Sequence, residues 1–330
     1  MPSEDVSLPE HLRSMVCLGG GHGLFQTLRA ARILQVPNIQ AIVTVADDGG
    51  SSGRIRRELG QIPPGDLRMA LSALARDDAE GMMWEQLLQH RFAGTGALAG
   101  HAVGNLLIAG LTDVLGNETA ALDVVAKLTR SYGRVLPMCA QPLEIEAEVA
   151  GLSDDPRLIR NLRGQVAVAT TPGEVRRVRL LPDRPPASLE ALAAIQDADL
   201  LTIGPGSWFT SVIPHILVPD IVAAINESQA LRVVILNLSN TQLETTGFSI
   251  ERHVHMLRQH APELRVDRFL LDRAMPIDST ALSHLERAAA AMGAVVQVDD
   301  VRKFRDNGEV TDRHAPEKLA RSLLRLMPAD

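Results

Sequence analysis

Two adjacent carboxylates and a run of small residues follow an apolar segment early in the sequence. The stretch AIVTVADDGGSSGR, residues 41–54, places Asp47 and Asp48 directly after a predicted β-strand. Such carboxylates could hold Mg²⁺ with its waters, orient a sugar hydroxyl or act as a base. The small residues could form an anion-binding nest, and the arginine adds a planar fork suited to phosphate. The donors expected in this stretch are Gly50, Ser51, Ser52 and Arg54.

A simpler alternative treats the same stretch as a capped loop, with Asp48 or Ser51 as the N-cap of a following helix. That alternative explains one acid and one serine but not the whole cluster. We therefore expect a ligand site at the carboxyl end of this strand, the edge at which open α/β sheets bind ligands.

A glycine-rich turn, GGGHG at residues 19–23, lies between a predicted strand and a predicted helix. Glycines let backbone N–H groups approach a phosphate, and the helix N-terminus adds a partial positive charge. The dinucleotide pattern G-x-G-x-x-G is not met, because Leu24 stands at its third glycine position. A tight turn without a ligand is the alternative. The ligand contacts expected here are Gly20, Gly21, His22 and Gly23.

The segment IPPGDLRMALSAL, residues 62–74, places polar residues at the start of another predicted helix. Asp66 is a candidate N-cap, and Arg68 stands in the first turn, where a cation is unfavourable for the helix dipole. A ligand would explain this arginine, and so would an ion pair with an acid. Further along, His101 and Asn105 are four residues apart and share a helix face. A ligand contact and a packed structural histidine both fit that pair.

Two more polar loops follow predicted strands in the second half of the chain. Residues 203–214, IGPGSWFTSVIP, could grip a second phosphate, although no lysine follows as in a Walker loop. Residues 237–249, NLSNTQLETTGFS, follow the next strand, with a polar surface loop as the alternative. Because each loop follows a strand, we expect all of them to gather at one sheet edge around a phosphate-rich ligand. The candidates are Gly204, Gly206, Ser207, Thr210, Ser211, Asn237, Glu244 and Thr245.

The hydrophobic periodicity predicts an α/β protein with a Rossmann-like, mainly parallel sheet flanked by helices. A helical subdomain, residues 66–130, is expected after the second strand, within a single domain over residues 1–330 that has a loose tail at 1–14. Residues 134–137 with 143–151 are predicted to form one extended stretch, and 165–170 with 174–181 another, more antiparallel one. The remaining predicted strands cover residues 15–18, 39–46, 200–203, 232–236, 266–271 and 294–298.

Composition limits the functional classes. The chain has 330 residues, a formal net charge of −7 and 3% aromatic residues, which gives no general attraction for nucleic acid or an anionic membrane. No apolar run reaches the ~18 residues of a membrane span and no signal-peptide pattern is present, so a cytoplasmic location is expected. The two cysteines, Cys17 and Cys139, match no metal-binding spacing.

Five of these segments together resemble the gluconeogenesis factor (YvcK-like) proteins, within the superfamily of 2-phospho-L-lactate transferase (CofD). The resemblance covers about residues 15–326 and is carried by CLGGGHGLFQTLRA, VTVADDGGSSGRIRRELG, PPGDLRMALSALA, GHAVGNLLIAGL and GPGSWFTSVIPHILVPDIVAAI. It implies a Rossmann-like sheet with a helical subdomain and the binding of UDP-sugars such as UDP-N-acetylglucosamine. It also implies a role in growth on gluconeogenic carbon sources and in cell shape and wall synthesis, with no established reaction.

Two hypotheses for function follow. The first is a nucleotide-sugar-binding regulator that requires no cofactor, forms a homo-oligomer and acts through a cell-wall synthesis protein. The second is a Mg²⁺-dependent transferase of a phosphate-linked group, in which Asp47 or Asp48 holds the metal ion. The chain offers no evident nucleophile, but direct transfer between bound substrates needs only positioning and charge stabilisation. Whether the protein is an enzyme therefore stays open at this point.

Two positions depart from the pattern of the resembled family. After Asn237, a Q-x-G-E-T-like run is replaced by S-N-T-Q-L-E-T, which keeps Glu244 and Thr245 but places Leu243 at the glycine. Near the C-terminus, Ala315 stands where an acid commonly follows the histidine. Both changes fall in the distal, sugar-side or regulatory part of the expected site.

Overall fold

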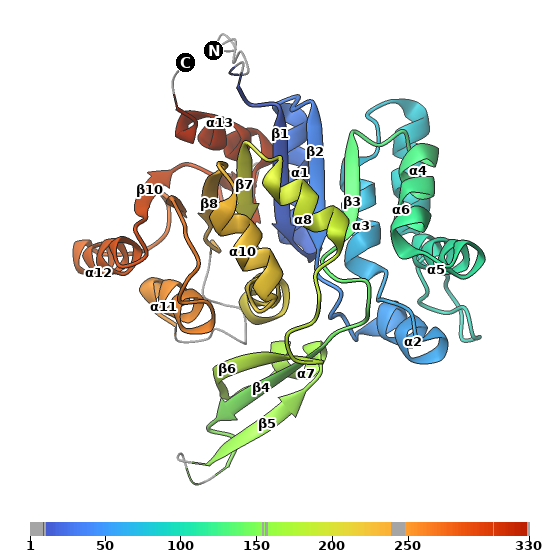
Figure 1. Ribbon diagram of the computed structural model, residues 1–330, viewed down its shortest axis with the longest axis horizontal. Coiled ribbons are helices and arrows are strands. Elements are labelled where there is room, and N and C mark those ends of the chain that lie inside the picture. Colours follow the sequence, from blue (N-terminus) through green and yellow to red (C-terminus); the bar gives the residue numbers. More distant parts are fainter. Residues whose placement is uncertain are drawn as a thin grey trace.

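A seven-stranded parallel sheet forms the central layer of the protein (Figure 1). The computed structural model describes residues 9, 11–153, 155, 158–238, 248–305 and 307–328. The strands of the sheet are β1 (Ser14–Gly19), β2 (Asn38–Val43), β3 (Gly133–Pro137), β7 (Leu200–Ile203), β8 (Leu231–Ile235), β9 (Arg268–Asp272) and β10 (Val295–Asp299). Their order is β10-β9-β8-β7-β1-β2-β3, and every neighbouring pair is parallel. The predicted Rossmann-like sheet is therefore confirmed.

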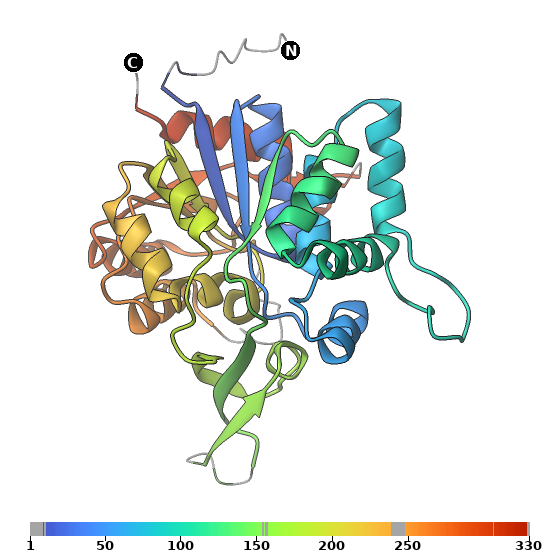
Figure 2. The same ribbon diagram turned by 45° about the vertical axis from the view of Figure 1, so that its right-hand side comes forward.

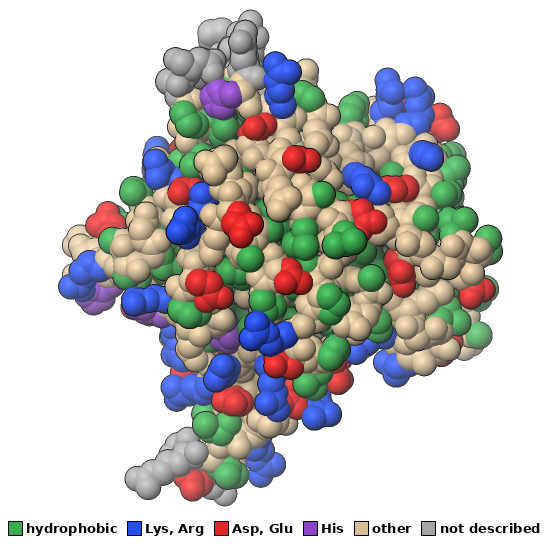
Figure 3. All heavy atoms as spheres, viewed as in Figure 1, with side chains coloured by type: hydrophobic (Ala, Val, Ile, Leu, Met, Phe, Trp, Pro, Cys, Tyr) green, Lys and Arg blue, Asp and Glu red, His purple; other side chains and the backbone are tan. Residues whose placement is uncertain are grey.

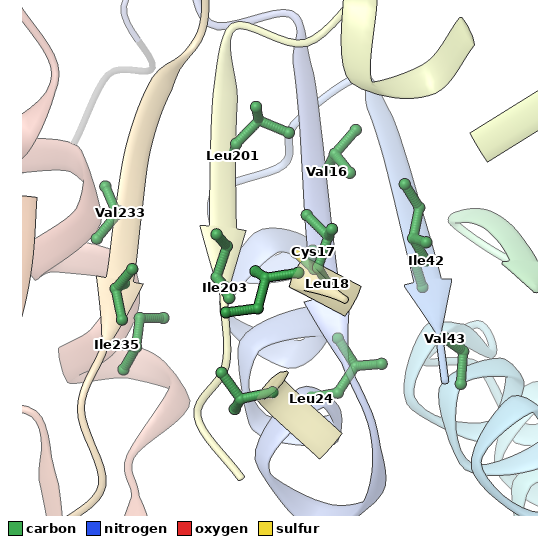
Figure 4. Packing of buried hydrophobic residues seen from close by; sticks show 14 of the residues in the cluster. Val16, Cys17, Leu18, Leu24, Ile42, Val43, Leu201, Ile203, Val233 and Ile235 are labelled. Carbon is green, nitrogen blue, oxygen red and sulfur yellow. The ribbon is translucent and has the colours of Figure 1, made fainter. Parts of the chain in front are cut away.

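The central strands are apolar along their whole length, as expected for parallel strands covered on both faces. Every residue of β1 and of β7 is buried. Figure 4 shows Val16, Leu18, Ile203 and Val233 on neighbouring strands of this core. Burying a side chain of this size stabilises the fold by roughly 1.5–3 kcal/mol. The packed core thus fixes the strand ends from which the candidate loops depart.

Helices cover both faces of the sheet (Figures 1 and 2). The flanking helices include α1 (Gly21–Ile33), α8 (Leu189–Gln196), α10 (Pro219–Glu227) and α13 (Pro316–Leu326). Helix α1 packs against α13 on one face, whereas α8 packs against α10 on the other. The helical spacing of Leu24, Leu28 and Ala31 places all three on the buried side of α1. The other helices of the second half are the π-helical turn η1 (Trp208–Val212), α9 (Ile213–Ile216), α11 (Ile250–His260) and α12 (Ser279–Ala290).

The expected helical subdomain lies between β2 and β3. It consists of α2 (Gly50–Leu59), α3 (Gly65–Leu74), α4 (Ala79–Gln89), α5 (Val103–Leu115) and α6 (Glu118–Leu128). Helix α3 packs against α1 and so ties the subdomain to the sheet. Helix α4 begins at Ala79, because Asp78 caps it by accepting a hydrogen bond from the backbone N–H of Gly81 (2.9 Å).

A separate antiparallel sheet projects from the main body below α7 in Figure 1. It contains β4 (Glu144–Ala150), β5 (Ile159–Arg163) and β6 (Glu174–Leu181), and α7 (Gln165–Ala169) follows β5. Two expectations are corrected here. Residues 134–137 and 143–151 belong to different sheets, because the chain leaves the main sheet after β3. The predicted strand 165–170 is wrong, since Gly164 turns the chain at φ 97° and a short helix follows.

A C-terminal hairpin, formed by β11 (Arg302–Phe304) and β12 (Val310–His314), was not predicted. Its Arg302 guanidinium forms a buried ion pair with Asp272 at the end of β9 (Nε to Oδ1, 2.8 Å). The same guanidinium donates to the backbone carbonyl of Leu238. These contacts hold the hairpin against the carboxyl end of the sheet.

Part of the predicted N-terminal tail is packed rather than loose. Leu12 is fully buried, and β1 already begins at Ser14. Among the described residues, no single helix is long and apolar enough to cross a membrane. One bent pair, Trp208–Ile216 with Pro219–Glu227, passes that test by length and composition alone. On the face drawn in Figure 3, acidic and basic side chains are interspersed.

Candidate functional site

The loops after β1 and β7 lie where the sheet changes direction. From β1 the chain runs outward through β2 and β3, whereas β7 to β10 run towards the opposite edge. Open α/β sheets bind ligands in the crevice at such a switch point. The two loops are in contact there, because a Cβ added at Gly23 would overlap the backbone carbonyl of Pro205. This close approach explains why the turn after β1 requires glycine.

A pocket of about 360 Å³ opens at this switch point. The loop after β8 reaches it through Asn237, whose Nδ2 donates to the carbonyl oxygen of Gly206 (2.8 Å). In return, Asn237 Oδ1 accepts from the Gly206 N–H (3.0 Å), so the pair joins the two loops. The lining residues are His22, Gly23, Gln26, Pro205, Gly206, Asn237, Leu238, Asp312, Arg313 and His314.

The predicted hydroxyl donors after β7 differ in exposure. Ser207 is partly exposed, and its hydroxyl is hydrogen-bonded to that of Thr210. Thr210 and Ser211 are buried within η1, and neither lines the pocket. Gly204 ends the strand by donating its N–H to the Leu18 carbonyl oxygen (2.9 Å). Ser207 is also absent from the pocket lining, so none of these three predicted hydroxyls lines the pocket.

An acidic corner lies on the other side of the glycine turn. Asp66 accepts a hydrogen bond from the backbone of Gly21, and Asp47 accepts one from the Ser52 hydroxyl. Burial, reinforced by the negative charge of Asp47, raises the pKa of Asp66 to about 7. Burial also raises the pKa of Asp47. This corner thus brings together two carboxylates from different elements, and a cation or a shared proton would relieve their repulsion.

Asp48 points to a different partner from its neighbour. Its Oδ1 accepts from the backbone N–H of Val166 in α7 (2.9 Å), so it braces the short helix beside the small sheet. It does not cap α2, whose N-cap residue is Gly49. Similarly, Asp66 is not the N-cap of α3, because that position is Pro64. The two adjacent aspartates are therefore separated in role, and Asp66 takes the place beside Asp47 that Asp48 was expected to share.

Ser51, Arg68, His101 and Asn105 form one buried hydrogen-bonded chain. Arg68 Nε donates to Asn105 Oδ1 (2.9 Å), and Asn105 Nδ2 donates to Ser51 Oγ (3.0 Å). Ser51 Oγ lies 2.9 Å from His101 Nδ1. Arg68 also donates to the side-chain oxygen of Gln89, so both of these acceptors are amides rather than the acid expected as the alternative to a ligand. Burial, with the nearby Arg54 charge, lowers the pKa of His101.

Arg54 is engaged with a loop of the helical subdomain. Its Nη2 donates to the carbonyl oxygen of Ala99 at 2.7 Å, and Nη1 lies 3.5 Å from that of Ala97. Gly50 stands one turn earlier, at the start of α2 with φ 45°. The Arg54 guanidinium, which we expected to bind phosphate, is thus hydrogen-bonded to backbone carbonyls of its own chain.

Sequence reasoning missed the wall that the C-terminal hairpin contributes. Asp312, Arg313 and His314 all line the pocket, yet β12 is a short and largely exposed strand without alternating pattern. His314 is buried, which lowers its pKa to about 4, and its Nε2 finds no hydrogen-bond partner among the described residues. Glu244 and Thr245 lie outside the described residues.

Comparison with known proteins connects this geometry to a family. The family model described as 2-phospho-L-lactate transferase CofD matches residues 15–313. A relative from Mycobacterium leprae, described as "Putative gluconeogenesis factor", is 55% identical over 94% of this chain and 85% of its own. The gluconeogenesis factor of Listeria monocytogenes is 32% identical over 95% of both chains. This chain belongs to the gluconeogenesis factor family.

A solved structure supports the family fold. The crystal structure of a UPF0052 family member from Bacillus halodurans is 34% identical to this chain, with a TM-score of 0.81. The match covers 94% of this chain and 99% of the other. The fold is therefore shared over most of this chain, and the candidate loops are those of a gluconeogenesis factor with a CofD-type domain.

Proposed function

We propose that the protein is a cytoplasmic nucleotide-sugar-binding regulator that binds UDP-sugars such as UDP-N-acetylglucosamine. Through a cell-wall synthesis protein it would act on cell shape and wall synthesis during growth on gluconeogenic carbon sources. The main support is the convergence of three strand-end loops and the C-terminal hairpin on one pocket at the switch point. Ligand pockets in α/β proteins form at such points.

The pocket offers groups suited to each part of such a ligand. Helix α1 starts at the pocket with glycines and carries no acid in its first turn, which suits a diphosphate. Arg313 supplies a permanent positive charge from the opposite wall. Asp312 and Asn237 supply oxygen acceptors for ribose or sugar hydroxyls.

We further propose that the acidic corner takes Mg²⁺ when a diphosphate is bound. Carboxylate oxygens are typical Mg²⁺ ligands, and the ion usually shares them with substrate phosphates. Asp47 and Asp66 fit this chemistry, because burial raises the pKa of both carboxyls and the negative charge of Asp47 further disfavours the ionised form of Asp66 until a cation is present. The corner adjoins the glycine turn through the bond from Gly21 to Asp66, so the ion and the pocket share one loop.

Titration calorimetry with three ligands tests the proposal. UDP-N-acetylglucosamine should bind, UMP should bind more weakly because it lacks the second phosphate, and free N-acetylglucosamine should give no heat. Mg²⁺ should strengthen binding of the diphosphate ligand, and Asp47→Ala should remove that effect while leaving the Mg²⁺-free affinity nearly unchanged. Absence of heat with every UDP-sugar, with and without Mg²⁺, would reject nucleotide-sugar binding.

A further inference from the structure

The three-stranded sheet has one covered edge and one open edge. Along β6, the Val178 N–H donates to His260 Nε2 (2.9 Å), and Gln259 donates to the Arg176 carbonyl oxygen (3.2 Å), so α11 covers that side. At the other side β5 is the last strand, and in both ribbon views no described segment lies alongside its outer edge (Figures 1 and 2). Ile159 on β5 is 52% exposed.

The register of β5 defines which backbone groups face outward. Gly164 donates its N–H to the Ile145 carbonyl oxygen (2.8 Å), which makes this pair a hydrogen-bonded one. Hydrogen-bonded and non-bonded pairs alternate along an antiparallel ladder. Arg160 and Leu162 therefore direct their backbone groups towards β4. The outward-facing backbone N–H and C=O groups are those of Ile159, Asn161 and Arg163.

We propose that two copies of the chain associate by antiparallel pairing of their β5 strands about a two-fold axis at Asn161. In this register Asn161 lies opposite Asn161 of the second copy, and Ile159 lies opposite Arg163 of the second copy. The outward backbone groups of the two strands then satisfy one another, and the two three-stranded sheets join into one continuous sheet. The inference gives the expected homo-oligomer a defined interface and is independent of the proposed ligand.

The distribution of charge favours this register. Charged residues commonly protect an edge strand from pairing, and β5 carries Arg160 and Arg163. However, the positive charge of Arg163 is partly offset by its ion pair with the buried Glu146, a carboxylate that Arg163 shares with Arg179. Centring the axis on either arginine would place two guanidiniums opposite each other, which is unfavourable. Centring it on Asn161 pairs the whole strand and places Arg160 opposite Leu162 of the second copy.

Disulfide trapping tests the interface directly. In a hydrogen-bonded antiparallel pair the Cα atoms are about 5.5 Å apart, within the range that a disulfide can bridge. Both native cysteines are buried, so a cysteine introduced at 161 would be the reactive one. Under mild oxidation, Asn161→Cys should give a covalent dimer, whereas Val114→Cys, at an 81% exposed position on α5, should not. Equal dimer yields for both variants, or none for Asn161→Cys, would overturn the proposal.

Sedimentation of the uncrosslinked protein provides a second test. Asn161→Pro removes an outward N–H that the β4–β5 ladder does not use, so the fold should be retained as judged by circular dichroism. Asn161→Ala keeps that N–H and serves as the matched control. The native chain and Asn161→Ala should dimerise with rising concentration, and Asn161→Pro should stay monomeric. A native chain that sediments as a monomer throughout, or a dimeric Asn161→Pro, would overturn the proposal.

Discussion

At the scale of single residues, the hydroxyl of Ser51 has a defined direction. Arg68 can only donate, so Asn105 must present its oxygen to Arg68 and its NH₂ group to Ser51. The Ser51 hydroxyl, which accepts from Asn105, still has its own proton to donate to an unprotonated His101 Nδ1. When the Ser51 hydroxyl donates to Nδ1, the neutral His101 ring carries its proton on Nε2. The hydroxyl of the next residue, Ser52, donates a hydrogen bond to Asp47.

Removing Asn105, the central residue of this hydrogen-bonded series, should destabilise the fold. Asn105→Ala leaves the Arg68 Nε and the Ser51 hydroxyl without their partner, which costs about 1–3 kcal/mol of unfolding free energy. Gly110→Ala on the same helix is the control, because a Cβ at that position meets open space. This substitution should raise the unfolding free energy by up to about 1 kcal/mol. Urea denaturation of both variants measures the difference. Equal stabilities of Asn105→Ala and the native chain would contradict the assigned bonds.

The raised pKa of Asp66 predicts a pH-dependent effect of its neutral isostere. In the folded protein the pKa of Asp66 is about 7, above the ordinary 3.8. The protonated carboxyl therefore contributes most to the unfolding free energy below pH 3.8, and this contribution is lost as the pH rises through 7. At alkaline pH the unfolding free energy of Asp66→Asn should therefore exceed that of the native chain by roughly 1–2 kcal/mol. The difference is smaller than the full pKa shift would give, because the Asp66 side chain is partly exposed. Denaturation at several pH values checks this. Asp113→Asn, at an exposed position, is the control and should show no such pH dependence. A stability difference between Asp66→Asn and the native chain that stays constant across pH would contradict the raised pKa.

At the scale of elements, the loop after β2 holds α7 through Asp48. The residues of α7, QVAVA, alternate β-branched valine with alanine, so the local pattern predicts a strand. The helix forms because Gly164 reverses the chain and a carboxylate distant in sequence accepts the Val166 N–H. Local reasoning could not predict a cap supplied from residue 48. It did predict the glycine turns and the helical subdomain, because those depend on neighbouring residues alone.

Loss of this distant cap should loosen α7. Asp48→Ala should lower the unfolding free energy by about 0.5–2 kcal/mol, as for other lost caps. Hydrogen exchange at the Val166 amide should become faster, while amides of α3 keep their protection. Asp183→Ala, at an exposed position after β6, is the control and should leave both unchanged. Unaltered exchange at Val166 in Asp48→Ala would show that the carboxylate does not hold the helix.

At the scale of the whole molecule, the pocket is a product of topology. No local sequence pattern predicts that β7 pairs with β1. This pairing brings Gly23 against Pro205 and Asn237 against Gly206. The loops could be predicted one by one and their sheet edge inferred. The hairpin wall could not, because its position depends on the ion pair between Asp272 and Arg302, thirty residues apart.

The central claim is that the hairpin closes a nucleotide-sugar pocket, and one pair of variants tests it most directly. Arg313 lines the pocket, whereas Arg305 in the same hairpin forms an exposed ion pair with Glu309. In calorimetry with UDP-N-acetylglucosamine, Arg313→Ala should weaken binding roughly tenfold or more, as expected for a lost charge-assisted bond. Arg305→Ala should bind as the native chain does. Equal affinities for the two variants would contradict the account.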